Sequence, residues 1–328
     1  MAETALAYWG GTDLPPVLIK ARENVVFRAT LRSGAEVALR LHRPGYQSRQ
    51  AIEAELGWAD RLAGQGLPVP RAVRTASGAL TARAGDRVAS AVGWLAGTPV
   101  GAAERRLDGT PEDQRRMMVQ VGALLARLHD ATDGLNLPPD WDRPRWDTEG
   151  FLGKHPLWGR FWENPALSPG ERDVILDAAA VARGMLADCH AGGTDFGLIH
   201  GDVMRENLLA RDAGLALIDF DDSGWGWRLY DLATAVFQSL EEPALPAIVA
   251  GLVEGYRSGR ALSASDAARL PLFVMLRTFA STGWVTTRLA PDNPWQAHYA
   301  GRAVRLARHV LDGTSPWADQ SHPSAQIG

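Results

Sequence analysis

The sequence of 328 residues has almost no cysteine or lysine and no long hydrophobic run. Cys189 is the single cysteine, so the chain can form neither an intrachain disulfide nor a zinc cluster of thiolates. No apolar stretch reaches the roughly 20 residues of a membrane span, and no basic segment followed by an apolar one opens the chain. We therefore expect no signal peptide, no membrane partner and a cytoplasmic location. Lys20 and Lys154 are the only lysines, so arginine is expected to fill roles that lysine often fills.

An excess of positive charge is also missing. The chain has 34 Lys+Arg against 38 Asp+Glu, a formal net charge of −4. Nucleic-acid binding needs clustered excess cation, so nucleic acid is not an expected partner. With 46% hydrophobic and 22% charged residues, the composition is that of a globular protein and excludes fibrous chains. The length exceeds what one hydrophobic core usually serves, so two lobes are expected.

The first hundred residues predict a small lobe rich in strands. Two β-prone runs at 25–31 and 36–41, separated by a short polar turn, predict a hairpin. Apolar residues at helical spacing predict a helix over 48–63 that ends before Gly64 and Gly66. A further strand is expected over 88–95, ending before Gly97. The N-terminal lobe is therefore placed at 1–97.

The rest of the chain predicts a mainly helical lobe, placed at 98–314. Helices are expected over 112–132, 170–190 and most of 228–313, with short strands at 197–200 and 215–218. The segment 134–169 has many Pro and Trp residues and little periodicity, which is typical of a functional loop. Residues 315–328 are expected to form a mobile tail.

The most informative part of the sequence lies between Leu198 and Asp222. There, three residues with carboxylate or amide side chains lie in or beside polar loops that apolar strands flank: Asp202, Asn207 and Asp219. Phosphorylation of a hydroxyl needs a carboxylate that accepts the hydroxyl proton and oxygen ligands for magnesium. Asp202 suits the first task, and Asn207 and Asp219 suit the second, since Mg²⁺ prefers oxygen donors.

This segment resembles the catalytic loop His-x-Asp-x-x-x-x-Asn and the metal-binding Asp-Phe-Gly of protein kinases, with Gly201 after the histidine and Asp221 in place of the glycine. The His-Gly-Asp form is similar to the aminoglycoside phosphotransferase family, which also includes choline kinases, type II homoserine kinases and the bacterial stress-response protein kinase. The resemblance implies a bilobal, protein-kinase-like α+β fold, with ATP as co-substrate and Mg²⁺ as cofactor. It covers about residues 24–256.

The resemblance also implies nucleotide-binding residues in the small lobe. In the family, a strand cation contacts the nucleotide phosphates and pairs with a helix glutamate, and Arg40 with Glu55 is the best match here. Arg40 stands where lysine is commoner, and guanidinium binds phosphate well. Glu53 is the rival of Glu55. Gly93 and Leu95 would belong to a hinge whose backbone groups contact adenine.

Other polar residues near the motif have structural interpretations. His200 is expected to orient the loop, and His129 is most simply a packed core histidine. Asp231 is expected to cap a helix or to anchor the catalytic loop from beneath.

A set of charged and aromatic residues follows the predicted metal ligand. We interpret it as a possible acceptor pocket for a cationic group, formed by Asp221, Asp222, Trp225 and Trp227. The alternative is that the tryptophans, including those at 141–162, pack in the core.

Three functions fit these patterns. The first is an ATP- and Mg²⁺-dependent kinase of a small hydroxylated molecule such as an amino alcohol, amino sugar or aminoglycoside. The second is a serine/threonine protein kinase like the stress-response kinase. The third is a catalytically silent nucleotide-binding module, which the complete set of Asp202, Asn207 and Asp219 disfavours. The sequence does not name the acceptor, because specificity lies in local sites rather than in the fold.

Overall fold

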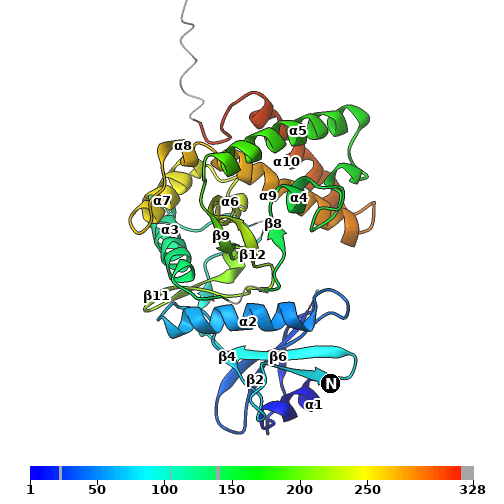
Figure 1. Ribbon diagram of the computed structural model, residues 1–328, viewed down its shortest axis with the longest axis vertical. Coiled ribbons are helices and arrows are strands. Elements are labelled where there is room, and N and C mark those ends of the chain that lie inside the picture. The colour runs from blue at the N-terminus through cyan, green and yellow to red at the C-terminus, as the bar shows by residue number, and fades with distance from the viewer. Residues whose placement is uncertain (22–23, 104, 138–140, 319–328) are drawn as a thin grey trace, which may run out of the picture. The chain divides into compact units, whose positions relative to one another are not determined.

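The computed structural model describes residues 1–21, 24–103, 105–137 and 141–318, in two compact units (Figure 1). The first unit contains Met1–Pro99, Ala131–Arg143 and Asn207–Asp221, and the second contains Val100–Asp130, Pro144–Glu206 and Asp222–Gly328. The sequence pattern indicates a boundary near residue 97. It does not reveal that the two later segments Ala131–Arg143 and Asn207–Asp221 also belong to the first unit. Of the expected tail, residues 319–328 lie outside the described residues.

An antiparallel sheet forms the centre of the first unit. Its strands follow the order β1-β2-β3-β6-β4, and β5 also pairs with β6. The bounds are β1 (Val17–Ala21), β2 (Val25–Thr30), β3 (Glu36–Leu41), β4 (Ala72–Val73), β5 (Thr81–Ala84) and β6 (Arg87–Gly93). The predicted hairpin is confirmed as β2 and β3, whose turn uses Gly34 at φ 85°.

Alternation along β3 separates the hydrophobic core from a cavity that contains the charged side chain of Arg40. Val37, Leu39 and Leu41 are buried in a core with α1 (Ala2–Leu6) and Trp9 of the following 3₁₀ turn, η1 (Ala7–Trp9). Ala38 and Arg40 point to the opposite face, because successive strand side chains alternate. The core helix α1 was not predicted from the sequence.

The helix α2 (Arg49–Gly64) covers the pocket face of this sheet (Figure 1). The Ser48 hydroxyl accepts the Ala51 N–H at 2.9 Å and caps its first turn. Its buried stripe contains Ile52, Leu56, Ala59 and Leu62, as the predicted periodicity requires.

A second, three-stranded sheet in this unit presents the motif residues. It contains β7 (Thr98–Pro99), β10 (Leu208–Arg211) and β11 (Gly214–Leu217), in the order β11-β10-β7. Leu208 pairs with Leu217, so Asn207 and Ile218 lie at the same end of the β10–β11 hairpin.

The second unit is mainly helical. Its helices are α3 (Pro111–Asp133), α4 (Thr148–Leu152), α5 (Pro169–Ala191), α6 (Arg228–Phe237), α7 (Leu245–Arg257), α8 (Ala264–Ala267), α9 (Leu270–Arg288) and α10 (Pro294–Leu311), with the 3₁₀ turns η2 (Phe161–Glu163) and η3 (Arg205–Asn207). Residues 131–133 of α3 and Asn207 of η3 already belong to the first unit. A small sheet joins β8 (Arg145–Trp146), β12 (Gly224–Trp227) and β9 (Phe196–Ile199).

The helix α9 is almost entirely buried and packs against α6 and α10. No helix in the described part of the chain is both long and apolar enough to cross a membrane.

The prediction of an irregular loop over 134–169 was wrong in part. This segment contains β8, α4 and η2, and residues 138–140 lie outside the described ones. These elements are too short to give a readable periodicity, and tertiary packing of their aromatic residues stabilises them.

We predict that Trp58→Ala lowers the free energy of unfolding by about 3–5 kcal/mol. Trp58 is 1% exposed; its indole donates to Thr132 Oγ1 at 3.2 Å and its ring meets Phe220 edge-on at 5.2 Å. Urea denaturation followed by circular dichroism measures the change. Trp295→Phe is the control, because Trp295 is 39% exposed and should change stability by no more than about 0.5 kcal/mol. Equal losses in both variants would contradict the prediction.

Candidate active site

Arg40 lies among three carboxylates in the first unit. Its Nη1 is 3.0 Å from Glu55 Oε1, and its Nη2 is 2.6 Å from Asp219 Oδ1. Asp221 Oδ1 lies 3.6 Å from Nη1. Burial opposes the charge on the guanidinium, but Asp219, Glu55 and Asp221 outweigh burial and raise the pKa of Arg40, so Arg40 stays a cation.

The helix partner of Arg40 is Glu55 rather than Glu53. Burial raises the pKa of Glu55 to about 7, although the charge of Arg40 opposes the shift. Glu53 instead accepts hydrogen bonds from Thr81 Oγ1 at 2.6 Å and Arg49 Nε at 2.9 Å. The ion pair that the sequence predicted, Arg40 with Glu55, is therefore present, and the rival pair is not.

Asn207 and Asp219 lie at one end of the β10–β11 hairpin. Ile218 N–H donates to the Asn207 carbonyl at 2.9 Å, which closes this end. Among the described residues, Asp219 is the one residue other than glycine with a positive φ, 68°. Such a conformation is costly for aspartate and is typical of functional turns.

These two side chains suit a magnesium ion bound to nucleotide phosphates. Such an ion takes one or two protein oxygens and completes its shell with phosphates and water. The described residues contain no group of three or more His, Cys, Asp or Glu that could hold a metal alone. The donors therefore fit a Mg²⁺ that arrives with a nucleotide better than a resident metal.

A cavity with one apolar and one charged side adjoins Arg40. Its apolar lining includes Val26, Ala38, Leu56, Ala59 and Val92, and its polar lining includes Arg40, Glu55, Ser90 and Asp219. An apolar wall beside a fixed cation suits an aromatic base with phosphates.

The predicted hinge residues lie at the end of β6. The Gly93 N–H already donates to the Arg71 carbonyl at 2.8 Å, and the Trp94 N–H donates to the Glu36 carbonyl at 3.0 Å. These two N–H groups are therefore engaged within the sheet. A contact of Leu95 with adenine stays a prediction.

Asp221, predicted to bind the acceptor, is engaged within the first unit. Its carboxylate accepts hydrogen bonds from Asn24 Nδ2 at 3.0 Å and Gln47 Nε2 at 3.2 Å. Arg143 donates to its carbonyl at 2.6 Å. Asp221 is 9% exposed, so it holds segments of the first unit together. Asn24, Gln47 and Arg143 had no motif that could have identified them from the sequence.

The loop His200–Asp202, predicted to be catalytic, lies in the second unit and is held from α6. Asp231 accepts the backbone N–H of His200 at 2.8 Å and of Gly201 at 2.7 Å. It also contacts His129 Nε2 at 3.1 Å. Burial opposes ionisation of Asp231, but the hydrogen bonds from His129 and Gly201 outweigh it and lower the pKa, so Asp231 is an anion beneath the loop.

Two further residues shape this loop. Gly201 has φ 77°, and a Cβ there would lie 2.6 Å from the Asp222 carbonyl, so the position favours glycine. The His200 ring accepts the Asp202 N–H at Nδ1, at 3.2 Å. This hydrogen bond is consistent with the expected orienting role of His200.

The structure adds Arg277, which the sequence analysis missed. It lies on α9, is 3% exposed, and donates from Nη2 to Asp202 Oδ1 at 2.8 Å. Asp202 itself keeps a side-chain exposure of 20%. One feature of the sequence could have identified Arg277: it is the single charged residue in the apolar run 270–280. A buried arginine usually has a charged partner, so this position predicts a carboxylate nearby.

The four residues predicted to bind the acceptor do not act as one set. Trp227 is 3% exposed and packs on Phe196 and Phe273 with ring centroids 5.3 and 5.9 Å away. These contacts favour core packing of Trp227, the alternative that the sequence analysis left open. Asp222 and Trp225 are half-buried in the second unit, and their role stays a prediction.

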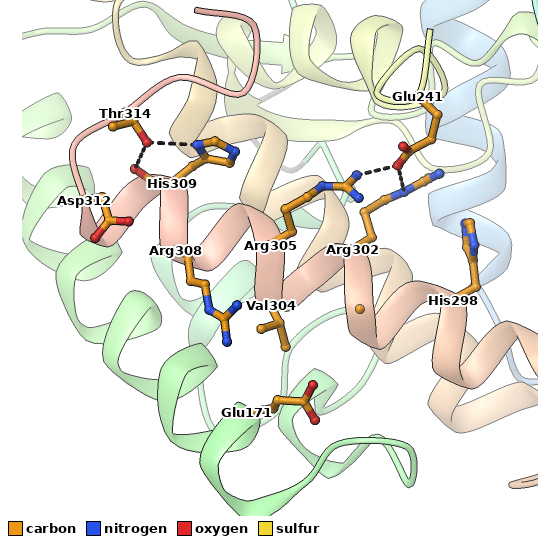
Figure 2. A pocket seen from close by; sticks show the side chains of 11 residues that line it. Glu171, Glu241, His298, Arg302, Val304, Arg305, Arg308, His309, Asp312 and Thr314 are labelled. Atoms are coloured by element: carbon orange, nitrogen blue, oxygen red, sulfur yellow. Dashed lines mark hydrogen bonds and ion pairs between the residues drawn. The ribbon is translucent and has the colours of Figure 1, made fainter. Parts of the chain in front are cut away.

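A larger cavity of about 830 Å³ lies elsewhere in the second unit (Figure 2). It runs along α10, which contributes His298, Arg302, Arg305 and Arg308. Glu241 neutralises part of this charge through Arg302 and Arg305. None of the motif residues lines this cavity.

Comparison with known proteins identifies the family. Residues 17–269 match the family described as "Phosphotransferase enzyme family". The chain belongs to this family. The relatives with informative names are small-molecule kinases, and the kinase-like α+β fold that the sequence predicted is confirmed.

Two similar proteins have informative names. A Pseudomonas aeruginosa protein named "Homoserine kinase" is 30% identical over 283 residues, which cover 84% of this phosphotransferase and 80% of that relative. The solved structure of a "microcompartment-associated aminopropanol kinase" superposes with a TM-score of 0.82 at 28% identity and covers 96% of this chain and 98% of that one. An amicoumacin kinase, at 19% identity and a TM-score of 0.76, shares the fold.

We predict that Arg40→Ala raises the KM of this phosphotransferase for Mg-ATP by about tenfold or more, because it removes the cation expected to contact the phosphates and breaks the ion pairs with Glu55 and Asp219. Arg40→Lys should recover most of the loss, since an ammonium keeps the charge. Steady-state kinetics with varied ATP measures both. If lysine is as damaging as alanine, the two separate contacts of Nη1 and Nη2 are required rather than the charge.

Proposed function

We propose that the protein transfers the γ-phosphate of ATP, with Mg²⁺, to a hydroxyl of a small molecule that carries an amine. The observation that carries this proposal is the support of Asp202. Asp231 holds the backbone of its loop, and the carboxylate keeps a side-chain exposure of 20%. A general base needs this combination of fixed position and access.

The remaining residues of the motif take complementary tasks. Asp202 accepts the proton of the acceptor hydroxyl as the oxygen attacks the γ-phosphorus. Arg40, fixed by Glu55, contacts phosphate oxygens and offsets their charge. Asn207 and Asp219 would hold Mg²⁺, which neutralises charge on the phosphates when bound.

The choice of a small amine-bearing alcohol rests on the relatives. Homoserine and aminopropanol, which the names of two relatives contain, each combine a hydroxyl with an amine. In this chain Asp222 is the candidate partner of the ammonium group, and Trp225 the candidate aromatic neighbour.

We predict that Asp202→Asn lowers kcat by about 10²-fold or more and leaves the Kd for Mg-ATP nearly unchanged, because the lost carboxylate acts on the acceptor. A coupled assay of ADP formation measures kcat, and isothermal titration measures Kd. Turnover close to that of the wild type would rule out Asp202 as the base.

Asp219→Ala serves as the matched comparison within the same motif. It removes a metal ligand rather than the base, so it should abolish productive Mg-ATP binding. Unchanged Mg-ATP affinity in this variant would contradict the proposed role of Asp219.

We predict that the enzyme prefers an amine-bearing alcohol to its amine-free analogue, for example 3-aminopropanol to 1-propanol, by at least about tenfold in kcat/KM. Asp222→Asn should narrow this ratio, because it removes the proposed counter-charge. Assays with both alcohols on both proteins decide the matter. A best substrate without an amine would overturn the acceptor class and leave the kinase assignment in place.

A further inference from the structure

We infer that Arg277 is a positioning residue that holds the carboxylate of Asp202 in the orientation needed to accept the hydroxyl proton. This inference rests on the proposed function, because it presumes that Asp202 is the base. It assigns to α9 a role in catalysis that the sequence motif does not contain.

The guanidinium of Arg277 contacts the catalytic loop at several points. Its Nη2 donates to Asp202 Oδ1 at 2.8 Å, and its Nη1 donates to the Gly201 carbonyl at 3.3 Å. The Met204 sulfur lies 3.5 Å from Nη2. One planar group therefore contacts both the backbone before the base and the carboxylate of the base, which restricts the χ angles of Asp202.

The position of Arg277 itself is restricted by aromatic rings. Its Cζ lies 4.7 Å from the centroid of the Trp158 ring and 5.3 Å from that of Phe237. Trp158 in turn packs edge-on against Trp146, with centroids 5.3 Å apart. A cation that stacks on fixed rings has few alternative rotamers, so it is a rigid partner for Asp202.

The ion pair with Asp202 also explains how the positive charge of Arg277 is tolerated in the buried interior of the second unit. Burial opposes the charge on Arg277, but the carboxylate of Asp202, followed by Tyr230 and then Asp222, outweighs burial and raises the pKa of Arg277. An unpaired cation at 3% exposure would be strongly destabilising. Arg277 is therefore stabilised at this position by the carboxylate that we propose it orients.

Two helices thus support the loop in different ways. Asp231 of α6 holds backbone N–H groups, whereas Arg277 of α9 holds the reactive side chain. The two helices pack against each other. A shift of a catalytic group by about 1 Å can cost about 10²-fold in rate, so the side-chain support should affect kcat directly.

The experiment compares kcat, at saturating Mg-ATP and acceptor, for wild type, Arg277→Met, Arg277→Lys, Asp202→Asn and the double variant Asp202→Asn/Arg277→Met. We expect Arg277→Met to lower kcat by about 10²-fold and to change the Kd for Mg-ATP by less than about twofold. Arg277→Lys should retain about tenfold more activity than Arg277→Met, because it keeps the charge without the planar contacts. In the Asp202→Asn background, Arg277→Met should change the residual rate by less than about threefold.

Arg302→Met is the matched control for the loss of a buried arginine. Arg302 is 5% exposed and also lies over Phe237, at 5.2 Å, but its ion pair goes to Glu241 at the cavity of Figure 2. It should lower the melting temperature as Arg277→Met does and leave kcat within about twofold of wild type.

Each outcome separates the positioning role from a structural one. The inference is overturned if Arg277→Met keeps more than about a third of kcat, if Arg302→Met lowers kcat equally, or if Arg277→Met lowers the rate as much without Asp202 as with it. If Asp202→Asn is fully active, the proposed base has failed. If Asp202→Asn is inactive and Arg277→Met is active, only the inference about Arg277 has failed.

Discussion

The first unit depends on the ion pairs of Arg40. A guanidinium with 17% side-chain exposure on the pocket face of β3 is tolerated because Glu55 and Asp219 accept its hydrogen bonds and Asp221 adds a third negative charge. These residues come from a strand, a helix and a turn that are far apart in the sequence. Because each charge would be costly alone, the elements that carry them must come together for any one of them to be stable. The group that we propose to bind phosphate is thus also the group that joins the elements of this unit.

The second unit also contains a buried charge that its neighbours stabilise, beneath the loop His200–Asp202. Asp231 is fully buried and remains ionised because His129 and two backbone N–H groups donate to it. Asp231 in turn holds a loop in which position 201 has a left-handed backbone conformation, which glycine adopts more easily than other residues. Each unit thus contains part of the predicted motif. The first carries the cation and the proposed metal ligands, and the second carries the proposed base with its backbone and side-chain supports.

Membership of the phosphotransferase family and the choice of acceptor have different physical origins. The family is evident from residues whose spacing is set by one loop and one hairpin, so the motif can be read along the chain. The acceptor is chosen by side chains from several elements. For this reason the four residues predicted to form one acceptor pocket have different surroundings in the structure. Trp227 packs in the core, Asp221 belongs to the first unit, and Asp222 and Trp225 remain candidates for contact with the acceptor.

The amino-acid sequence by itself determined the local features of this protein. Hydrophobic periodicity predicted the β2–β3 hairpin and the helices α2, α3, α5 and those after Arg228, and the motif predicted Asp202, Asn207 and Asp219, because each depends on neighbours a few residues away. Short elements such as α1, β8 and α4 gave no readable period. The sequence favoured Glu55 over Glu53 as the partner of Arg40, and the structure confirmed that pair. Only the tertiary structure decided that Asp221 joins segments of the first unit and that Arg277 meets Asp202. Such contacts join residues up to 197 positions apart, and burial and charge pairing in the folded chain select them, whereas spacing along the sequence does not.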